Sequence, residues 1–165
     1  MPLKRHPALQ NLSLDHNLFL DQTRNIRALI DGDDDAEPLD DVVQSLLDFW
    51  HHHGKSHLQE EEEILFPLYL QHAPHARDEI ERLITGHNWL RDKIQELSDM
   101  PRYENTTPLL RSLESYIETH VENEERIVYE AIQSILDDNH LESYSKASEA
   151  FRQAVEQANN VQDAD

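Results

Sequence analysis

Apolar side chains recur every three or four residues along four long segments of this chain, and this spacing is the strongest constraint on its fold. The first segment runs from Leu9 to Ile30 and keeps the spacing for about six helical turns. Further stripes span residues 46–68, 80–97 and 109–135, and a shorter one follows at 144–158. Because a helix repeats every 3.6 residues and a strand every two, the pattern indicates amphipathic helices and no strands.

Glycine, proline and acidic residues separate these segments. The first helix is expected to end near Gly32, and Pro38 suits an early position in the next helix. Pro67 is expected to kink or restart the second helix, because proline lacks the backbone donor. Four long helices with short connections predict an all-α fold, an up-down-up-down four-helix bundle with an additional C-terminal helix. The final stretch, NNVQDAD, is expected to fray.

Length and charge narrow the class of protein. A chain of 165 residues suits one domain, expected to span residues 1–165. The net charge of -20 repels phosphate backbones and anionic lipid, which argues against nucleic-acid and membrane partners. No apolar run reaches the ~20 residues of a membrane span, and MPLKRHPALQ does not read as a signal peptide, so a cytoplasmic location is expected. The lack of cysteine excludes disulfides and thiolate metal sites.

An acidic stretch after the first segment superficially matches a calcium-binding EF-hand loop, beginning with Asp31, Asp33 and Asp35. The sixth position of that loop is Ala36 instead of glycine, and the twelfth is Val42 instead of glutamate. We therefore reject calcium there and expect a solvated acidic loop.

Four of the eleven histidines fall in the middle of the apolar stripes. His57 and Glu61 are four residues apart on the second segment, and His120 and Glu124 repeat this spacing on the fourth. Residues four apart on a helix lie about 40° apart around the axis and about 6 Å along it, so each pair points into the core together. The first and third segments each carry one inward histidine: His16 and His87.

A core that receives four imidazoles and two carboxylates must neutralise them, because burying an unpaired charge is costly. A single core histidine is more often an ordinary hydrogen-bonded residue than a ligand. The repeated His-x3-Glu pairs make that explanation poor for the whole set. Two cations would neutralise it, and iron, manganese and zinc all accept imidazole and carboxylate ligands. The predicted metal ligands are His16, His57, Glu61, His87, His120 and Glu124.

Two other helical metal signatures are absent from the sequence. Ferritin-like bundles use Glu-x-x-His, and no glutamate here has a histidine three residues later. The His-Glu-x-x-His signature of zinc proteases is missing as well.

The order of the predicted ligands resembles the hemerythrin-like (HHE cation-binding) domain family. The resemblance covers about residues 10–135 and rests on His16, 57-HLQEEEEILFP-67, His87 in TGHNWL, and 120-HVENEE-125. It implies a non-haem centre of two iron ions, oxo- or hydroxo-bridged, with Glu61 and Glu124 bridging and the four histidines as terminal ligands. This His4Glu2 set is most similar to that of the repair-of-iron-centres proteins. Oxygen-carrying hemerythrins have a fifth histidine where this chain has Arg91, and end with His-x4-Asp.

The resemblance implies about four protein ligands for each iron, and a bridging oxygen would make five of the six positions that iron commonly uses. The open position would take a small diatomic or peroxide ligand, namely dioxygen, nitric oxide or peroxide, or would let iron leave for another protein. We expect a protein that handles iron or small oxidants in stress response or iron-centre repair, with a protein redox partner. The alternatives are a non-enzymatic protein that stores, carries or senses dioxygen, and an interaction module with a structural metal site.

Residues around the predicted ligands carry weaker expectations. His53 lies one turn before His57 and is expected to hold its tautomer or to sit at the bundle end, with ligation as the alternative. Glu60 is expected to point only marginally toward the core, and Glu62 and Glu63 are expected on a solvated face.

Other polar and aromatic side chains are expected to have ordinary roles. Arg91 is expected to reach the surface, with an anion near the open position as the alternative. Tyr116, Tyr129 and Trp50 are expected to pack in the core. The remaining histidines are expected to face solvent: His6, His51, His52, His72, His75 and His140.

Overall fold

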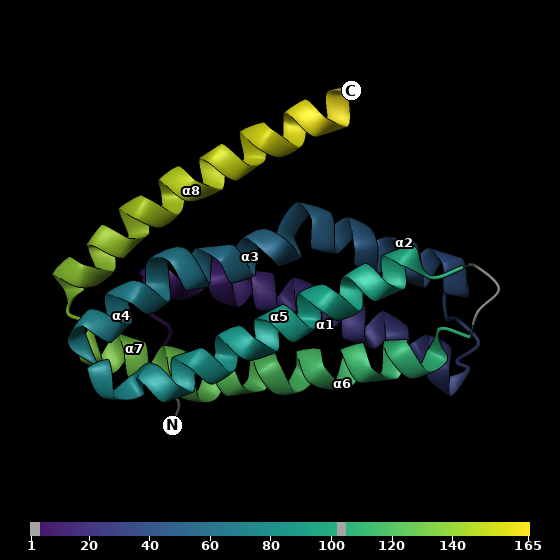
Figure 1. Ribbon diagram of the computed structural model, residues 1–165, viewed down its shortest axis with the longest axis horizontal. Coiled ribbons are helices and arrows are strands. Elements are labelled where there is room, and N and C mark those ends of the chain that lie inside the picture. Colours follow the sequence, from purple (N-terminus) through teal and green to yellow (C-terminus); the bar gives the residue numbers. More distant parts are fainter. Residues whose placement is uncertain (1–3, 102–104) are drawn as a thin grey trace.

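The computed structural model describes residues 4–101 and 105–165, which form helices joined by short turns, with no strand in these ranges. Four long helical segments lie side by side, and a further helix, α8, forms a separate layer along one side of them (Figure 1). The expected all-α fold with four long helical segments and an additional C-terminal helix is confirmed.

The first long segment is α1, Gln10–Asp31, which follows a 3-10 turn at Pro7–Leu9. It ends at Gly32, whose φ of 71° lies in the left-handed region that glycine adopts without strain. The Gly32 amide donates to the carbonyls of Ala28 and Leu29, so the cap satisfies the last turn of the helix. The predicted end of the first helix is therefore confirmed.

The second long segment consists of three helices: α2 (Leu39–Phe49), α3 (Lys55–Glu60) and α4 (Phe66–His72). Two π-helical turns, Trp50–Gly54 and Glu61–Leu65, join them. Pro67 lies in the first turn of α4, directly after the π turn, so the helix changes from π to α at the place where the sequence predicts a kink or restart. Single π turns within helices are frequent at functional sites.

The third and fourth segments complete the bundle. The third is α5 (Arg77–Asp99), and the fourth consists of α6 (Thr107–Asn123), a π turn at Glu124–Val128, and α7 (Tyr129–Ile135). Glu61 and Glu124 thus each open a π turn directly after a helix that carries an inward histidine. The two His-x3-Glu motifs therefore share one backbone geometry.

The C-terminal helix α8 spans Asp138–Ala164 and is capped by Asp137, whose side chain accepts a hydrogen bond from the His140 amide at 2.9 Å. Its gap to the bundle widens toward the C-terminus in Figure 1, and its buried residues are Leu141, Tyr144 and Ser148. The expectation that the last residues fray is wrong, because the helix continues to Ala164. Alanine and glutamine in these turns favour helix even where it is exposed.

Two apolar clusters fill the core and flank the inward ionisable residues. On α1, Leu12 belongs to one cluster and Phe19 to the other, and His16 lies between them. On α5, Leu83 and Leu90 flank the inward histidine in the same way. The ionisable side chains therefore occupy one level of the bundle with packed apolar layers on both sides.

Among the described residues, the helices lack the combination of length and apolarity that a bilayer crossing requires.

Candidate metal centre

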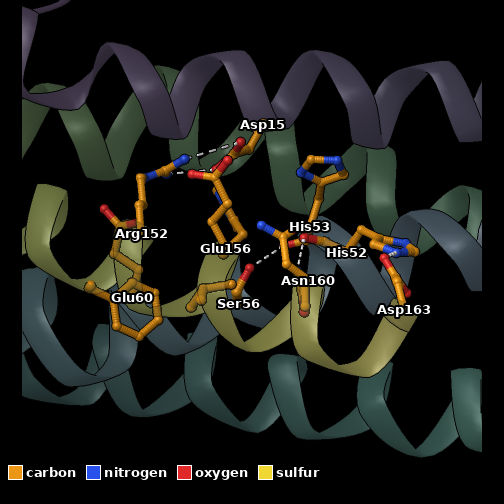
Figure 2. Close-up of a pocket in the computed structure, with 13 residues that line it drawn as sticks. Asp15, His52, His53, Ser56, Glu60, Arg152, Glu156, Asn160 and Asp163 are labelled. Carbon is orange, nitrogen blue, oxygen red and sulfur yellow. Dashed lines mark hydrogen bonds and ion pairs between the residues drawn. The ribbon is translucent and has the colours of Figure 1, made fainter. Parts of the chain in front are cut away.

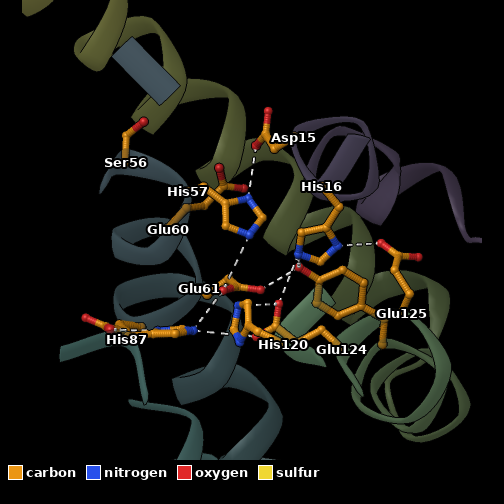
Figure 3. A network of polar contacts seen from close by, with 12 residues as sticks. Asp15, His16, Ser56, His57, Glu60, Glu61, His87, His120, Glu124 and Glu125 are labelled. Carbon is orange, nitrogen blue, oxygen red and sulfur yellow. Dashed lines mark hydrogen bonds and ion pairs between the residues drawn. The ribbon is translucent and has the colours of Figure 1, made fainter. Parts of the chain in front are cut away.

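The six side chains predicted as ligands come together in the middle of the bundle (Figure 3). The four histidines come from four different helices, α1, α3, α5 and α6, and the two glutamates from the π turns at Glu61–Leu65 and Glu124–Val128. Each of the six residues is at most 5% exposed.

The donors form two overlapping groups of four. We name position A the group of His16, His57, Glu61 and Glu124, and position B the group of Glu61, His87, His120 and Glu124. Within each group, one ligand atom from every residue lies within 4.8 Å of the others. Because both glutamates belong to both positions, the arrangement can hold two cations with two shared carboxylates.

Five inward atoms of this set have no hydrogen-bond partner among the described residues: His57 Nε2, Glu61 Oε2, His87 Nε2, His120 Nε2 and Glu124 Oε1. The Glu61 Oε2 atom lies 3.6 Å from Nε2 of both His57 and His87. A buried polar atom without a partner costs about 1–3 kcal/mol. These unpaired nitrogen and oxygen atoms face one another across short gaps. A set of metal ligands requires this arrangement, whereas a hydrogen-bonded core would pair the atoms.

Three of the four histidines donate their outer ring nitrogen, Nδ1, to a carboxylate. The distances are 2.7 Å from His16 to Glu125 Oε1, 3.1 Å from His57 to Asp15 Oδ2, and 2.8 Å from His87 to Glu62 Oε1. A proton on Nδ1 leaves the Nε2 lone pair directed inward. This is the tautomer that a metal ligand needs, and outer carboxylates commonly fix it.

An arginine holds each of these carboxylates from the outside. Arg152 Nη2 donates to Asp15 at 2.7 Å, Arg91 donates to both oxygens of Glu62 at 2.9 and 3.0 Å, and Arg5 Nη2 donates to Glu125 at 2.8 Å. The result is three relays of histidine, carboxylate and arginine around the centre.

The relays keep the outer carboxylates ionised. Burial alone raises the pKa of Asp15 and of Glu62, but hydrogen bonds from the histidine and the arginine outweigh it and lower both pKa values. For Glu125, burial is outweighed mainly by the hydrogen bond to His16, and the pKa falls to about 2. Charged acceptors therefore face three of the histidines at neutral pH.

The inner residues share protons when no metal is present. Burial lowers the pKa of His57 and of His120 to about 4, so both imidazoles are neutral at pH 7. Burial also lowers the pKa of His16, but hydrogen bonds to Glu124 and Glu125 outweigh it and raise the pKa to about 10. Burial and the charge of Glu124 raise the pKa of Glu61. A bound cation would replace these protons.

Tyr129 adds a donor to the centre. Its hydroxyl donates to Glu61 Oε1 at 2.5 Å, and its ring stacks on His16 with centroids 5.3 Å apart. Its complete burial confirms the expectation that Tyr129 packs in the core. Packing is not its whole role, because its hydroxyl also orients Glu61, one of the two shared glutamates.

Two expectations for the glutamate run are wrong. Glu62 does not lie on a solvated face, because the π turn brings it toward α5 and it binds His87 and Arg91. Glu60 is not marginal but fully buried, because α8 covers it. Its Oε1 accepts hydrogen bonds from Tyr144 at 2.5 Å and Ser148 at 2.7 Å.

His53 lies outside both donor groups, with its ring stacked on Phe49 at 6.2 Å. Asp15, which the sequence reasoning missed, holds the His57 tautomer instead. Glu125 was missed as well, although a second glutamate directly follows each His-x3-Glu motif and could have signalled it.

The family model of the hemerythrin HHE cation binding domain matches residues 8–132, a range that contains all six predicted ligands. Searches of curated proteins and of solved structures give no match. The match confirms the resemblance that the order of histidines and glutamates indicates in the sequence. The chain therefore belongs to the hemerythrin HHE cation-binding family, with a clustered His and Glu set that can bind metal ions.

Proposed function

We propose that this chain is a di-iron protein of the hemerythrin type that reacts with or senses small oxidants. In this proposal, residues 1–165 form one domain with the long helices in up-down-up-down order. One iron would be held at position A and one at position B, with the four histidines as terminal ligands and Glu61 and Glu124 as the ligands that both ions would share. The observation that carries the proposal is the set of five buried, unpaired donor atoms aimed at the same two places.

Iron fits this donor set because it accepts both neutral imidazole and carboxylate. When bound, iron supplies open coordination positions and an electron source for a small oxidant. The chain's own part is to keep the donors in place: the three relays fix the histidine rings, and Tyr129 holds a proton on Oη beside Glu61. The apolar clusters on both sides exclude water from the centre.

The burial of the centre restricts the ligand to a small molecule. A surface cavity of about 350 Å³ adjoins His120 and is lined by Gly86, Tyr116 and Thr119 among others. The Tyr116 ring stacks on His120 with centroids 5.6 Å apart. A Cβ on Gly86 would collide with the Tyr116 hydroxyl, so glycine allows this ring to lie between the cavity and position B. Dioxygen, nitric oxide and peroxide are small enough to pass beside one aromatic ring.

The experiment is anaerobic loading with ferrous iron, followed by addition of dioxygen or nitric oxide under spectroscopic observation. We expect about two irons per chain, a rapid and irreversible spectral change with dioxygen, and a distinct change with nitric oxide. A change that reverses when dioxygen is removed would assign storage or transport instead. A loaded protein that is inert to both gases, and that unfolds when iron is removed, would contradict the proposal and indicate a structural metal.

The biological setting follows from the same chemistry. A centre that binds iron and responds to small oxidants suits stress response or iron-centre repair, and turnover would require a protein redox partner. Deletion of the gene should then raise sensitivity to nitric oxide or peroxide, and unchanged sensitivity would argue against this role.

A further inference from the structure

A second group of possible metal donors lies on the surface, where the end of α8 meets the π turn before α3 (Figure 2). The turn carries three consecutive histidines, His51, His52 and His53. Asp163, near the end of α8, reaches this turn from the other side. His51, His52 and Asp163 each offer one ligand atom, and these atoms lie within 4.8 Å of one another.

The hydrogen bonds of His52 leave its second ring nitrogen, an acceptor in the neutral ring, facing an acceptor oxygen of Asp163. His52 Nδ1 lies 2.8 Å from the Asp48 carbonyl, which can only accept, so Nδ1 carries the hydrogen. In the neutral ring, Nε2 then presents a lone pair, and it faces Asp163 Oδ2 at 3.2 Å. Two acceptors at this distance need a proton or a cation between them. A tautomer fixed by a backbone carbonyl is typical of histidine ligands of metals.

The spacing and the third donor favour a cation. Two ligand atoms bound to one tetrahedral ion at about 2.1 Å lie about 3.4 Å apart, close to the separation of the His52 and Asp163 atoms. A shared proton would involve only those two atoms, whereas His51 places a further imidazole beside them. The ring centroids of His51 and His52 are 4.9 Å apart. The net charge of -20 also favours cation binding.

We propose that His51, His52 and Asp163 form a second metal site, separate from the buried centre, that takes a divalent transition cation such as Zn²⁺. Two imidazoles and one carboxylate suit Zn²⁺, and the exposed position leaves room for water as the fourth ligand. The site joins two elements that are far apart in sequence, so the ion ties the last turns of α8 to the bundle.

The tie matters because α8 covers one side of the buried centre. A cavity of about 390 Å³ lies between α8 and the α3 segment, and its lining includes Asp15, His57 and Glu60. Toward the C-terminus, the described contacts of α8 with the π turn are Asp163 on His52 and a 3.4 Å hydrogen bond from Asn159 Nδ2 to the His52 carbonyl. An ion at this end therefore holds α8 closed over the cavity.

The test uses the full chain, loaded with iron and titrated with zinc chloride by calorimetry. We expect one zinc per chain beyond the metal already bound, with the iron content unchanged. His52→Ala and Asp163→Ala should each weaken zinc binding about tenfold or more, since the loss of even an outer partner of a ligand costs 10–100-fold. Lys55→Ala should tighten it, because Lys55 Nζ lies 3.4 Å from His51 Nδ1 and competes with the cation.

The control is His53→Ala, a neighbouring histidine outside the donor group, which should bind zinc like the unmodified chain. Hydrogen exchange gives a second readout: zinc should slow amide exchange in the last two turns of α8, and Asp163→Ala should abolish this slowing. Equal zinc affinity in Asp163→Ala and the unmodified chain would overturn the proposal. So would a zinc count of zero, which would mean that a proton alone joins His52 to Asp163.

Discussion

Each outer carboxylate should control one metal position and leave the other intact. Asp15 contacts only the His57 ring of position A, and Glu62 contacts only the His87 ring of position B. Asp15→Asn and Glu62→Gln keep the shape of the side chain and remove its charge. The two variants therefore form a matched pair that separates the two ions.

The structure sets the size of the effect. The Asp15 and Glu62 side chains are 13% and 20% exposed, so solvent screens their hydrogen bonds only in part. In Asp15→Asn, Arg152 keeps its ion pair with Glu60 at 2.8 Å, so the loss is close to that of the single bond to His57. Loss of such outer partners lowers metal affinity 10–100-fold, or about 1.4–2.7 kcal/mol.

The assay is anaerobic equilibrium dialysis against a range of free ferrous iron, with iron per chain as the readout. Each single variant should fill one position like the unmodified chain and need 10–100-fold more free iron for the other. The double variant should show both losses. Asp21→Asn on the exposed side of α1 is the control, because its ion pair is with Arg24. If both single variants kept the binding curve of the unmodified chain, or if the control lost as much affinity, Asp15 and Glu62 would not support the metal positions.

Three further outcomes follow from the centre. Tyr129→Phe should lower the free energy of unfolding of the metal-free protein by about 1–3 kcal/mol, measured with urea, because Glu61 loses a buried donor; an unchanged midpoint would contradict this. Metal binding at pH 7 should release a proton, because the pKa of His16 is about 10 without metal. For one proton released, metal affinity should rise about tenfold per pH unit. Calorimetry in two buffers of different ionisation enthalpy would detect the release, and heats that do not depend on the buffer would contradict the prediction. Removal of iron by a chelator should lower the melting temperature, because iron at 100 times its Kd adds about 2.7 kcal/mol per ion to the free energy of unfolding. Equal melting temperatures with and without iron would show that the ions do not stabilise the fold.

The inner residues of the centre could be predicted from the sequence because helical periodicity reports them. His57 and Glu61 fall on the line of the apolar stripe, and the same spacing recurs at His120 and Glu124. An ionisable pair on the buried face of a helix needs a partner that neutralises it. The position of each pair along the apolar stripe was therefore enough to identify its residues as candidate metal ligands. The structure brings all of the selected residues together.

The outer relays could not be predicted, because their partners are distant in sequence. Arg152 reaches Asp15 from α8, and Arg5 reaches Glu125 from before α1. Periodicity assigned Glu62 to the surface because it assumes an uninterrupted α-helix. The π turn that begins at Glu61 changes the register, and no propensity or spacing rule in the sequence marks it.

The burial of Glu60 shows the same limit from the packing side. Helical periodicity places Glu60 at the edge of the apolar face. Whether this edge is exposed to solvent depends on the position of α8. Tyr144 and Ser148 close over it and supply two donors. Tertiary contacts of this kind determine the surroundings of the centre, whereas local periodicity indicates its candidate ligands.

Anomalous diffraction at the iron edge, from crystals of the anaerobically loaded protein, tests directly whether two iron ions occupy the centre. We expect two anomalous peaks per chain, one among the donors of position A and one among those of position B, with both glutamates between them. A single peak, or peaks elsewhere with the six side chains hydrogen-bonded to one another, would contradict this expectation.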